Sequence, residues 1–176
     1  MKTVLLTAVG SASAHAAHTS LSAAGYRVIG CDIYPKSWNV NSGEMTAFFQ
    51  VPLATDTEAY VEALQSIVRR ENVGSIVPLT DVEVDALCTR KAVFSALGAT
   101  VCCPDAPVAA LCRDKLRMAQ ALERAGLCTV IPTWTADDLP TELPYPLMLK
   151  PVRGRSSQAQ TVAHDAQELA QALRLR

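Results

Sequence analysis

Short apolar runs alternate with helical patterns along residues 1–103, and this alternation dominates the sequence. Runs that predict buried strands cover residues 2–9, 27–33, 74–79 and 99–103. A shorter run at residues 48–51, limited by Pro52, predicts an edge strand.

Amphipathic patterns that predict helices lie between these strands. The first helix is expected over residues 13–24, and the second follows the capping-box pattern of residues 55–58. A third helix is expected to begin at residues 80–81 and to include Phe94. Strands joined by helices of this length predict a Rossmann-like α/β domain, which is a doubly wound parallel sheet with right-handed crossovers.

The pattern changes at residues 104–107, which contain two prolines. Beyond them a helix is expected between a cap at Asp114 and a stop at Gly126. The remaining elements are expected to be a Pro-rich connection over residues 137–146, a strand over 147–151, a polar loop over 153–158, a strand over 159–163 and a helix that begins at Asp165. These elements predict a second, smaller and partial unit.

In parallel sheets, ligands bind at the carboxyl ends of the strands. Three strand ends of the predicted sheet carry small or polar residues that suit this position. The candidate substrate-binding residues are Gly10, Ser11, Asp32, Thr80, Asp81 and Glu83.

Candidate phosphate chemistry lies in the second unit, where an apolar strand ends at Lys150 and Pro151. The loop that follows contains two arginines, one glycine and two serines. A fixed cation beside backbone N–H groups and hydroxyls is a good cradle for nucleotide phosphates. The alternative is an exposed hairpin with solubilising charges, and the loop alone does not separate the two.

The wider context contains a motif series that resembles the ATP-grasp superfamily, in particular proteins like the carbamoyl-phosphate-synthase large subunit. That family has Asp-Lys at a helix start, then Gly and Pro near the next strand, then Lys-Pro before a Gly/Ser loop. The matching residues are Asp114, Lys115, Gly126, Pro132, Lys150, Pro151, Gly154, Ser156 and Ser157. Residues 77–83 are similar to an apolar strand and acidic turn in the domain that precedes the ATP-binding part.

The resemblance implies a pre-ATP-grasp Rossmann-like domain at residues 1–103 and the truncated start of an α+β ATP-grasp domain at residues 104–176. It implies an ATP-dependent carboxylate–amine or related ligase that forms an acyl phosphate from a small-molecule carboxylate. ATP would contact Lys115, Lys150, Arg153, Gly154, Ser156 and Ser157, the last four in a phosphate-covering loop. Magnesium ligands are expected outside this chain, so the chain alone is expected to be inactive, and no catalytic residue is assigned.

Composition excludes several partners. The net charge of -1 and pI near 6.3 provide no basic surface for nucleic acid. No apolar run approaches the length of a membrane span, and the six cysteines lack metal-ligand spacing, so a cytoplasmic protein is expected. The sequence does not determine the oligomeric state, and a homodimer is compatible with it.

Two alternatives remain. Gly10 after the first strand and Asp32 about twenty residues later resemble the ends of an NAD(P)-binding fingerprint, but the further glycines of that motif are absent. The other alternative is a non-catalytic nucleotide-binding module.

His15 and His18 are three residues apart and lack the further ligands of a metal site.

Overall fold

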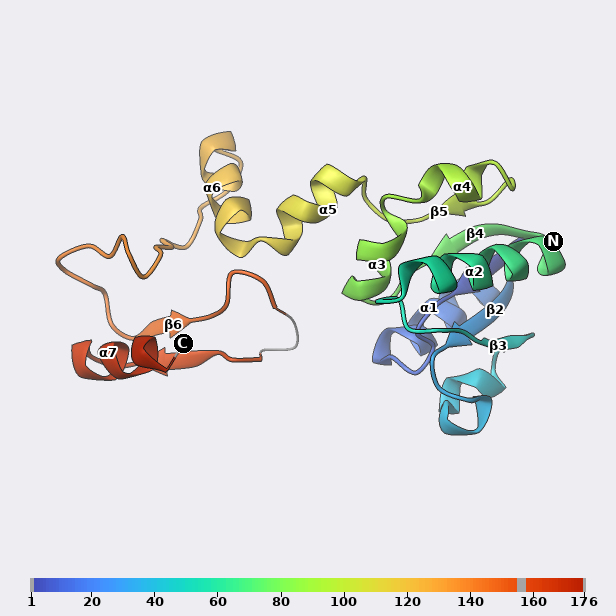
Figure 1. Cartoon of the computed structure of the whole chain (residues 1–176), viewed down its shortest axis with the longest axis horizontal. Helices are drawn as coiled ribbons and strands as arrows, with labels where there is room; N and C mark the ends of the chain where they lie inside the picture. The colour runs from blue at the N-terminus through green and yellow to red at the C-terminus, as the bar shows by residue number, and fades with distance from the viewer. Residues whose placement is uncertain (1, 155–157, 176) are drawn as a thin grey trace. The chain divides into compact units, whose positions relative to one another are not determined.

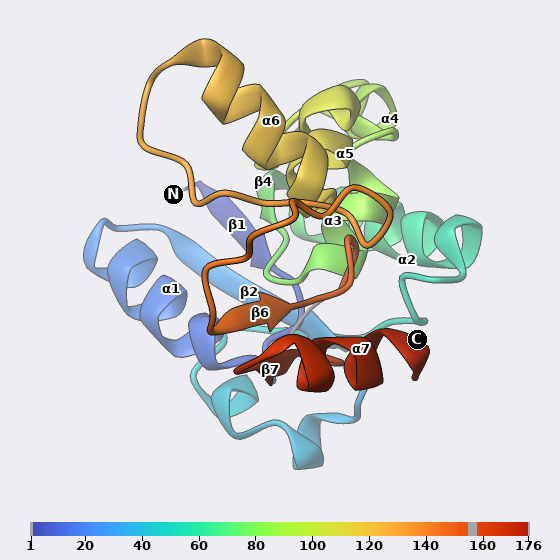
Figure 2. The same cartoon turned by 90° about the vertical axis from the view of Figure 1, so that its left-hand side faces the viewer.

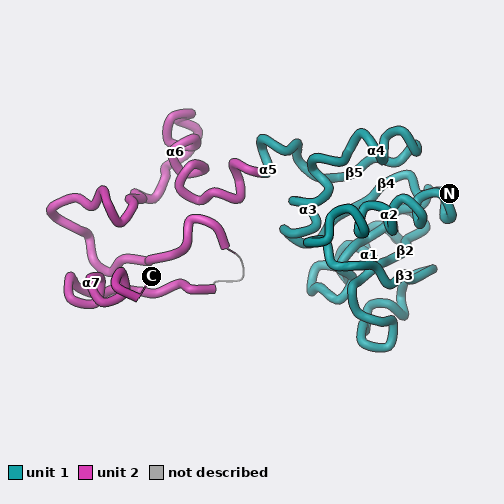
Figure 3. The backbone as a smooth tube through the Cα atoms, viewed as in Figure 1, with its two compact units in different colours: residues 1–109 teal, residues 110–176 magenta. Residues whose placement is uncertain are grey.

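The computed structural model describes residues 2–154 and 158–175, which form two compact units. Unit 1 comprises residues 1–109 and unit 2 residues 110–176 (Figure 3). The sequence places this division at residue 103, shortly before the helix in which the two units meet.

Unit 1 is built on a five-stranded sheet with the order β3-β2-β1-β4-β5. All four strand pairs are parallel, which confirms the predicted fold class (Figure 1). The strands are β1 (Thr3–Leu6), β2 (Arg27–Asp32), β3 (Phe48–Gln50), β4 (Val73–Val77) and β5 (Thr100–Val101). The short β3 lies at one edge, as the sequence predicted.

The helices of unit 1 follow the predicted order with two corrections. They are α1 (Ala12–Ala23), α2 (Thr57–Glu71), α3 (Asp81–Leu87) and α4 (Lys91–Ser95), with 3₁₀ turns η1 (Lys36–Trp38) and η2 (Val40–Gly43) between β2 and β3. The prediction of a single helix from residue 80 to Phe94 is wrong, because a turn at residues 88–90 separates α3 from α4. The cap of α2 is Asp56, whose carboxylate accepts from the N–H of Ala59, one residue later than the capping-box pattern indicated.

Alternating side chains of the buried strands pack on opposite faces of the sheet. Val4 and Leu6 lie in one cluster with Ala14 of α1, whereas Leu5 lies in a larger cluster with Leu64 of α2. Figure 2 shows α1 and α2 on either side of the sheet. Each fully buried Leu contributes about 1.5–3 kcal/mol, so the two clusters hold the sheet and its helices in place.

A glycine in the middle of β2 allows close packing on the α1 side. A Cβ at Gly30 would lie 2.7 Å from Cγ1 of Val9 and 3.0 Å from Cγ of Met45. We therefore expect Gly30→Ala to lower the free energy of unfolding by about 1–3 kcal/mol through overpacking. Urea unfolding of both variants measures this, with Gly74→Ala in β4 as the matched control.

A Cβ at Gly74 would lie 3.8 Å from the carbonyl oxygen of Thr3, an ordinary van der Waals contact. The Gly74→Ala variant should therefore unfold at or slightly above the wild-type urea concentration. Equal stabilities of the two variants would contradict the close packing at Gly30.

Unit 2 consists of short elements and little buried apolar surface. The elements are α5 (Ala106–Arg113), which begins in unit 1, then α6 (Lys115–Ala125), β6 (Leu147–Leu149), β7 (Thr161–Ala163) and α7 (Ala166–Arg174). Strands β6 and β7 pair antiparallel in a two-stranded sheet. Within the described part of this unit, Ala163 and Leu169 are its buried apolar residues.

Local capping chemistry in unit 2 agrees with the sequence predictions. Asp114 caps α6 by accepting from the N–H of Arg117 at 2.9 Å, and Gly126 ends that helix in the left-handed conformation. Asp165 caps α7 by accepting from the N–H of Glu168 at 2.8 Å. Across the described ranges, no helix is long and apolar enough to cross a membrane.

Candidate functional site

The first residue of α6 is tied to the segment that follows Lys150. The backbone N–H of Lys115 donates to the carbonyl of Val152 at 3.1 Å. The Lys115 ammonium donates to the carbonyl of Gly154 at 3.0 Å. Helix start and loop are therefore held together, although the Lys115 and Gly154 that meet there are 39 positions apart in sequence.

This junction brings a lysine at the start of α6 to the segment that contains Lys150 and Arg153. The Asp114 cap fixes Lys115 in the first turn of α6, where backbone N–H groups and the helix dipole favour negative charge. Lys150 follows β6 directly and is exposed, and among the described residues its ammonium forms no ion pair. The Gly154 carbonyl holds the Lys115 ammonium at the loop.

The structure describes four of the six residues that the sequence assigned to nucleotide. Lys115 and Gly154 are in contact, and Lys150 and Arg153 are exposed in the same segment. Ser156 and Ser157 lie outside the described residues. Across residues 2–154 and 158–175, no group of three or more His, Cys, Asp or Glu side chains is arranged to hold a metal ion.

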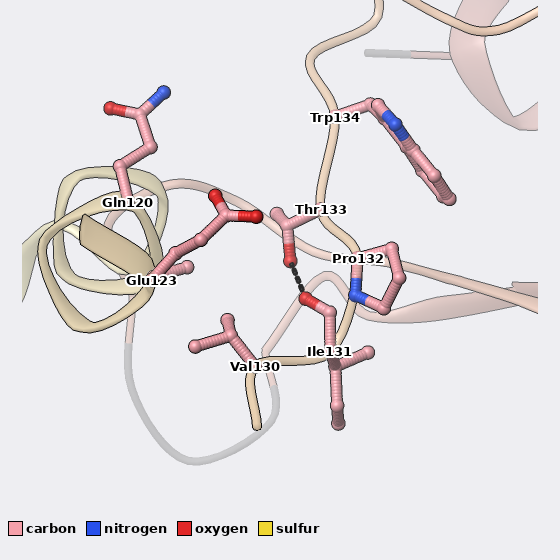
Figure 4. A pocket seen from close by; sticks show the side chains of 8 residues that line it. Gln120, Glu123, Val130, Ile131, Pro132, Thr133 and Trp134 are labelled. Atoms are coloured by element: carbon pink, nitrogen blue, oxygen red, sulfur yellow. Dashed lines mark hydrogen bonds between the residues drawn. The ribbon is translucent and has the colours of Figure 1, made fainter. Parts of the chain in front are cut away.

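A surface pocket of about 210 Å³ lies beside α6. Its walls come from Gln120 and Glu123 of the helix and from residues 130–134 (Figure 4). The hydroxyl of Thr133 donates to the carbonyl of Ile131 at 2.9 Å. The charged side chain among these lining residues is the carboxylate of Glu123, so the pocket does not suit phosphate.

In unit 1, Asp32 joins the ends of β1 and β2. One carboxylate oxygen accepts from the N–H of Gly10 at 2.8 Å, and the other accepts from the N–H of Tyr34 at 3.0 Å. Asp32 is buried. Both oxygens that would bind a ribose are thus engaged by backbone, so the NAD(P)-binding alternative is not favoured.

Gly10 and Ser11 occupy a tight turn before α1. A Cβ at Gly10 would lie 2.5 Å from the side-chain oxygen of Asn39, so a larger residue here would require the Asn39 side chain to move. The hydroxyl of Ser11 is buried and has no hydrogen-bond partner within the described residues. Their expected role in substrate binding stays a prediction.

Glu83 is the centre of a buried hydrogen-bond network at the ends of β1 and β4. It accepts from the hydroxyls of Thr7 at 2.7 Å, Tyr60 at 3.1 Å and Thr80 at 2.8 Å. It also accepts from the N–H of Thr80 at 3.2 Å, as the third residue of a helix does in a capping box. Burial, and the nearby Glu83 carboxylate, raise the pKa of Tyr60 well above its ordinary range.

This network was not predicted from the sequence. The capping relation of Thr80 and Glu83 was visible at their spacing, but the contacts to Thr7 and Tyr60 depend on tertiary structure. Asp81 begins α3 on the exposed side. The substrate candidates therefore form two clusters at the carboxyl edge, Gly10 with Asp32 and Thr80 with Glu83. Of the three acidic candidates, Asp32 and Glu83 are buried and Asp81 is exposed.

Comparison with solved structures finds the same fold in several enzymes. An L-amino acid ligase from Bacillus licheniformis matches 99% of this chain with a TM-score of 0.66 and 20% identity, and the match covers 42% of that protein. The N5-carboxyaminoimidazole synthetase from Staphylococcus aureus matches 99% of this chain with a TM-score of 0.68 and 17% identity, and the match covers 44% of that protein.

A third match is the biotin carboxylase domain dimer of the 2-oxoglutarate carboxylase from Hydrogenobacter thermophilus, solved with MgADP, ADP and bicarbonate. It has a TM-score of 0.66 and 16% identity over 99% of this chain, and the match covers 40% of that protein. The chain thus spans about two fifths of the length of these proteins. At such identities the likeness is one of fold.

Sequence comparison gave one family and no curated relative. No curated protein matches the chain. Residues 4–102, more than half of the chain, match the PylC-like N-terminal domain. This range contains the whole parallel sheet of unit 1 apart from the first residue of β1. The chain therefore belongs to the family with a PylC-like N-terminal domain, and unit 1 is the pre-ATP-grasp domain that the sequence predicted.

Proposed function

We propose that this chain provides the acceptor-binding domain and the first phosphate-contacting segment of an ATP-dependent carboxylate–amine or related ligase. The observation that carries the proposal is the contact of Lys115 with the loop that follows Lys150. It supports a single anion site formed by two cations and a helix N-terminus. A small-molecule carboxylate would bind at the carboxyl edge of unit 1. A cytoplasmic location fits such soluble substrates, and the proposal is compatible with a homodimer.

The proposed reaction begins with transfer of the γ-phosphoryl group of ATP to the carboxylate oxygen of the acceptor. ADP leaves, and an amine then attacks the acyl phosphate and releases inorganic phosphate. Lys115 and Lys150 would offset negative charge on the phosphates, which is the main protein contribution to this kind of reaction. Magnesium, when bound, would neutralise negative charge on the phosphates; among residues 2–154 and 158–175 no cluster of three or more His, Cys, Asp or Glu side chains is arranged to hold it.

The anion site predicts a specific loss of nucleotide affinity. Each charge-assisted hydrogen bond contributes about 1.5–3 kcal/mol, so Lys115→Gln or Lys150→Gln should weaken ATP binding by at least about tenfold. Isothermal titration of the purified chain with ATP and magnesium measures this effect, and phosphate release followed in parallel should stay at the background rate.

Lys2→Gln is the matched control, because Lys2 is an exposed lysine of unit 1. It should bind ATP like the unaltered chain. Equal affinities of all four proteins would contradict the proposed anion site. Magnesium-dependent turnover that disappears in Lys150→Gln would show that this chain holds the metal itself.

A further inference from the structure

An exposed aromatic pair lies on the segment between β2 and β3. The rings of Tyr34 and Trp38 stack with their centroids 5.7 Å apart and their planes at 28°. Tyr34 is 51% exposed, Trp38 is 73% exposed, and the neighbouring Val40 is 94% exposed. We call Tyr34, Trp38 and Val40 the aromatic platform.

A buried polar network holds this platform in place. The side-chain amide of Asn39 donates to the carbonyls of Tyr34 at 3.2 Å and Pro35 at 3.1 Å. The hydroxyl of Ser42 donates to the carbonyls of Lys36 and Asn39. Asn39 and Ser42 are 5% and 3% exposed, so the segment directs polar groups inward and large apolar groups outward. A segment that folded for its own stability would be expected to do the reverse.

The platform adjoins the ligand-binding edge of the sheet. Asp32 ties the N–H of Tyr34 to the end of β2, and its other oxygen holds the N–H of Gly10. Asn41 donates to the carbonyl of Val9 at 2.8 Å. The segment, light blue in Figures 1 and 2, projects from unit 1 next to β3. It is therefore anchored to the turn before α1, at the edge where parallel sheets bind their ligands.

The platform segment contains one cation, and the carboxylates at its two ends are engaged elsewhere: Asp32 by the N–H groups of Gly10 and Tyr34, and Glu44 by His15 at 3.0 Å. Lys36 lies between Tyr34 and Trp38 in sequence and is the sole charged residue between Asp32 and Glu44. An aromatic face with a lysine in the same short segment matches a planar ring with a carboxylate substituent.

We propose that the aromatic platform binds the acceptor acid of the ligase, and that this acid contains an aromatic or similar planar ring. The ring stacks on Trp38, and Lys36 offsets the charge of the carboxylate until the acid is phosphorylated. This inference rests on the proposed function only where it identifies the bound acid as the acceptor of the ligase. Binding of an aromatic acid to the platform requires no nucleotide and is tested without it.

The two tryptophans of the chain, Trp38 and Trp134, allow a direct test with an internal control. In a ¹⁵N-labelled chain they give two indole N–H signals, assigned with Trp38→Phe and Trp134→Phe. Phenylacetate should shift the Trp38 signal and leave the Trp134 signal in place. Trp38→Ala, monitored through backbone signals of residues 34–43, should weaken binding by about tenfold, as expected for loss of one stacking partner.

Matched ligands and one variant test each part of the proposal. Cyclohexylacetate has the same charge but no aromatic ring, and it should bind several-fold more weakly. Phenylacetamide lacks the charge and should also bind more weakly, by about twofold to fivefold, a preference that Lys36→Gln should remove. Trp38 is exposed, so its substitution should leave the fold intact, and unchanged backbone signals elsewhere in unit 1 would verify this.

Three results would overturn the proposal: a Trp38 signal that does not move up to the solubility limit of phenylacetate, equal binding of cyclohexylacetate, or a Trp38 signal that shifts with protein concentration alone. The last would identify a second copy of the chain as the occupant of the platform. If the chain binds phenylacetate but not ATP, the proposed function is refuted and the aromatic acid site is still supported.

Discussion

Replacing Glu83 with Ala is expected to lower the free energy of unfolding by about 3–5 kcal/mol, the largest effect of any single substitution considered for this chain. Glu83 is buried and accepts from three hydroxyls and one backbone N–H, which come from Thr7, Tyr60 and Thr80. Its removal leaves these donors without a partner in the interior. Urea unfolding followed by circular dichroism measures the loss.

Two further variants separate the hydrogen bonds from charge in general. Glu83→Gln keeps the volume but directs an NH₂ group at donors, so it should also lose about 2 kcal/mol or more. Glu62→Gln removes a charge from the exposed side of α2 and should stay within about 0.5 kcal/mol of the unaltered chain. A Glu83→Ala variant as stable as Glu62→Gln would show that the network has no net effect on stability.

Alkaline pH is expected to destabilise unit 1, because the buried Cys31 thiol and the buried Tyr60 hydroxyl must stay protonated in the folded chain. Burial, with the nearby Glu83 and Asp32 carboxylates, raises the pKa of Cys31 well above its ordinary value of 9.0. Burial, with the neighbouring Cys31 and Glu83, raises the pKa of Tyr60 above its ordinary value of 10.0. The unfolded chain loses these protons first, so stability is full below about pH 9 and falls as the pH rises further.

The expected slope is up to about 1.4 kcal/mol per pH unit for each group once the pH exceeds its ordinary pKa. Urea unfolding between pH 8 and pH 11 measures it. Tyr60→Phe should be less stable at neutral pH, because it loses a hydrogen bond to Glu83, and its stability should fall less steeply above pH 10.

Tyr34→Phe is the control for this pH dependence, since Tyr34 is an exposed tyrosine. Its stability should follow the same curve as that of the unaltered chain. A Tyr60→Phe curve parallel to the unaltered one over the whole range would contradict the buried, neutral state of the Tyr60 hydroxyl.

The parts of the structure that depend on local chemistry were predictable from the sequence. The alternation of continuous apolar runs with amphipathic patterns predicted a parallel sheet in unit 1, because parallel strands are buried on both faces and need such runs. Asp114, Gly126 and Asp165 marked helix ends because the orphan N–H and C=O groups of a helix are satisfied by residues a few positions away.

The parts that depend on tertiary contacts were not predictable. Leu87 and Phe94 both lie in the core, so one helix fitted the pattern, yet a turn at residues 88–90 separates α3 from α4. Asp32 and Glu83 were chosen as substrate residues because they are acids at strand ends. Their hydrogen bonds to Gly10 and Thr7 join residues 22 and 76 positions apart, which no local pattern reveals.

The most direct measurement of the central claim uses the five lysines of the chain, Lys2, Lys36, Lys91, Lys115 and Lys150. Reductive methylation with ¹³C-formaldehyde gives each ammonium its own NMR signal, assigned by single Lys→Arg variants. If one anion site contains Lys115 and Lys150, ATP should shift their two signals with the same apparent affinity and leave those of Lys2 and Lys91 in place. Shifts of Lys115 and Lys150 at different ATP concentrations, or of neither, would contradict a shared phosphate site.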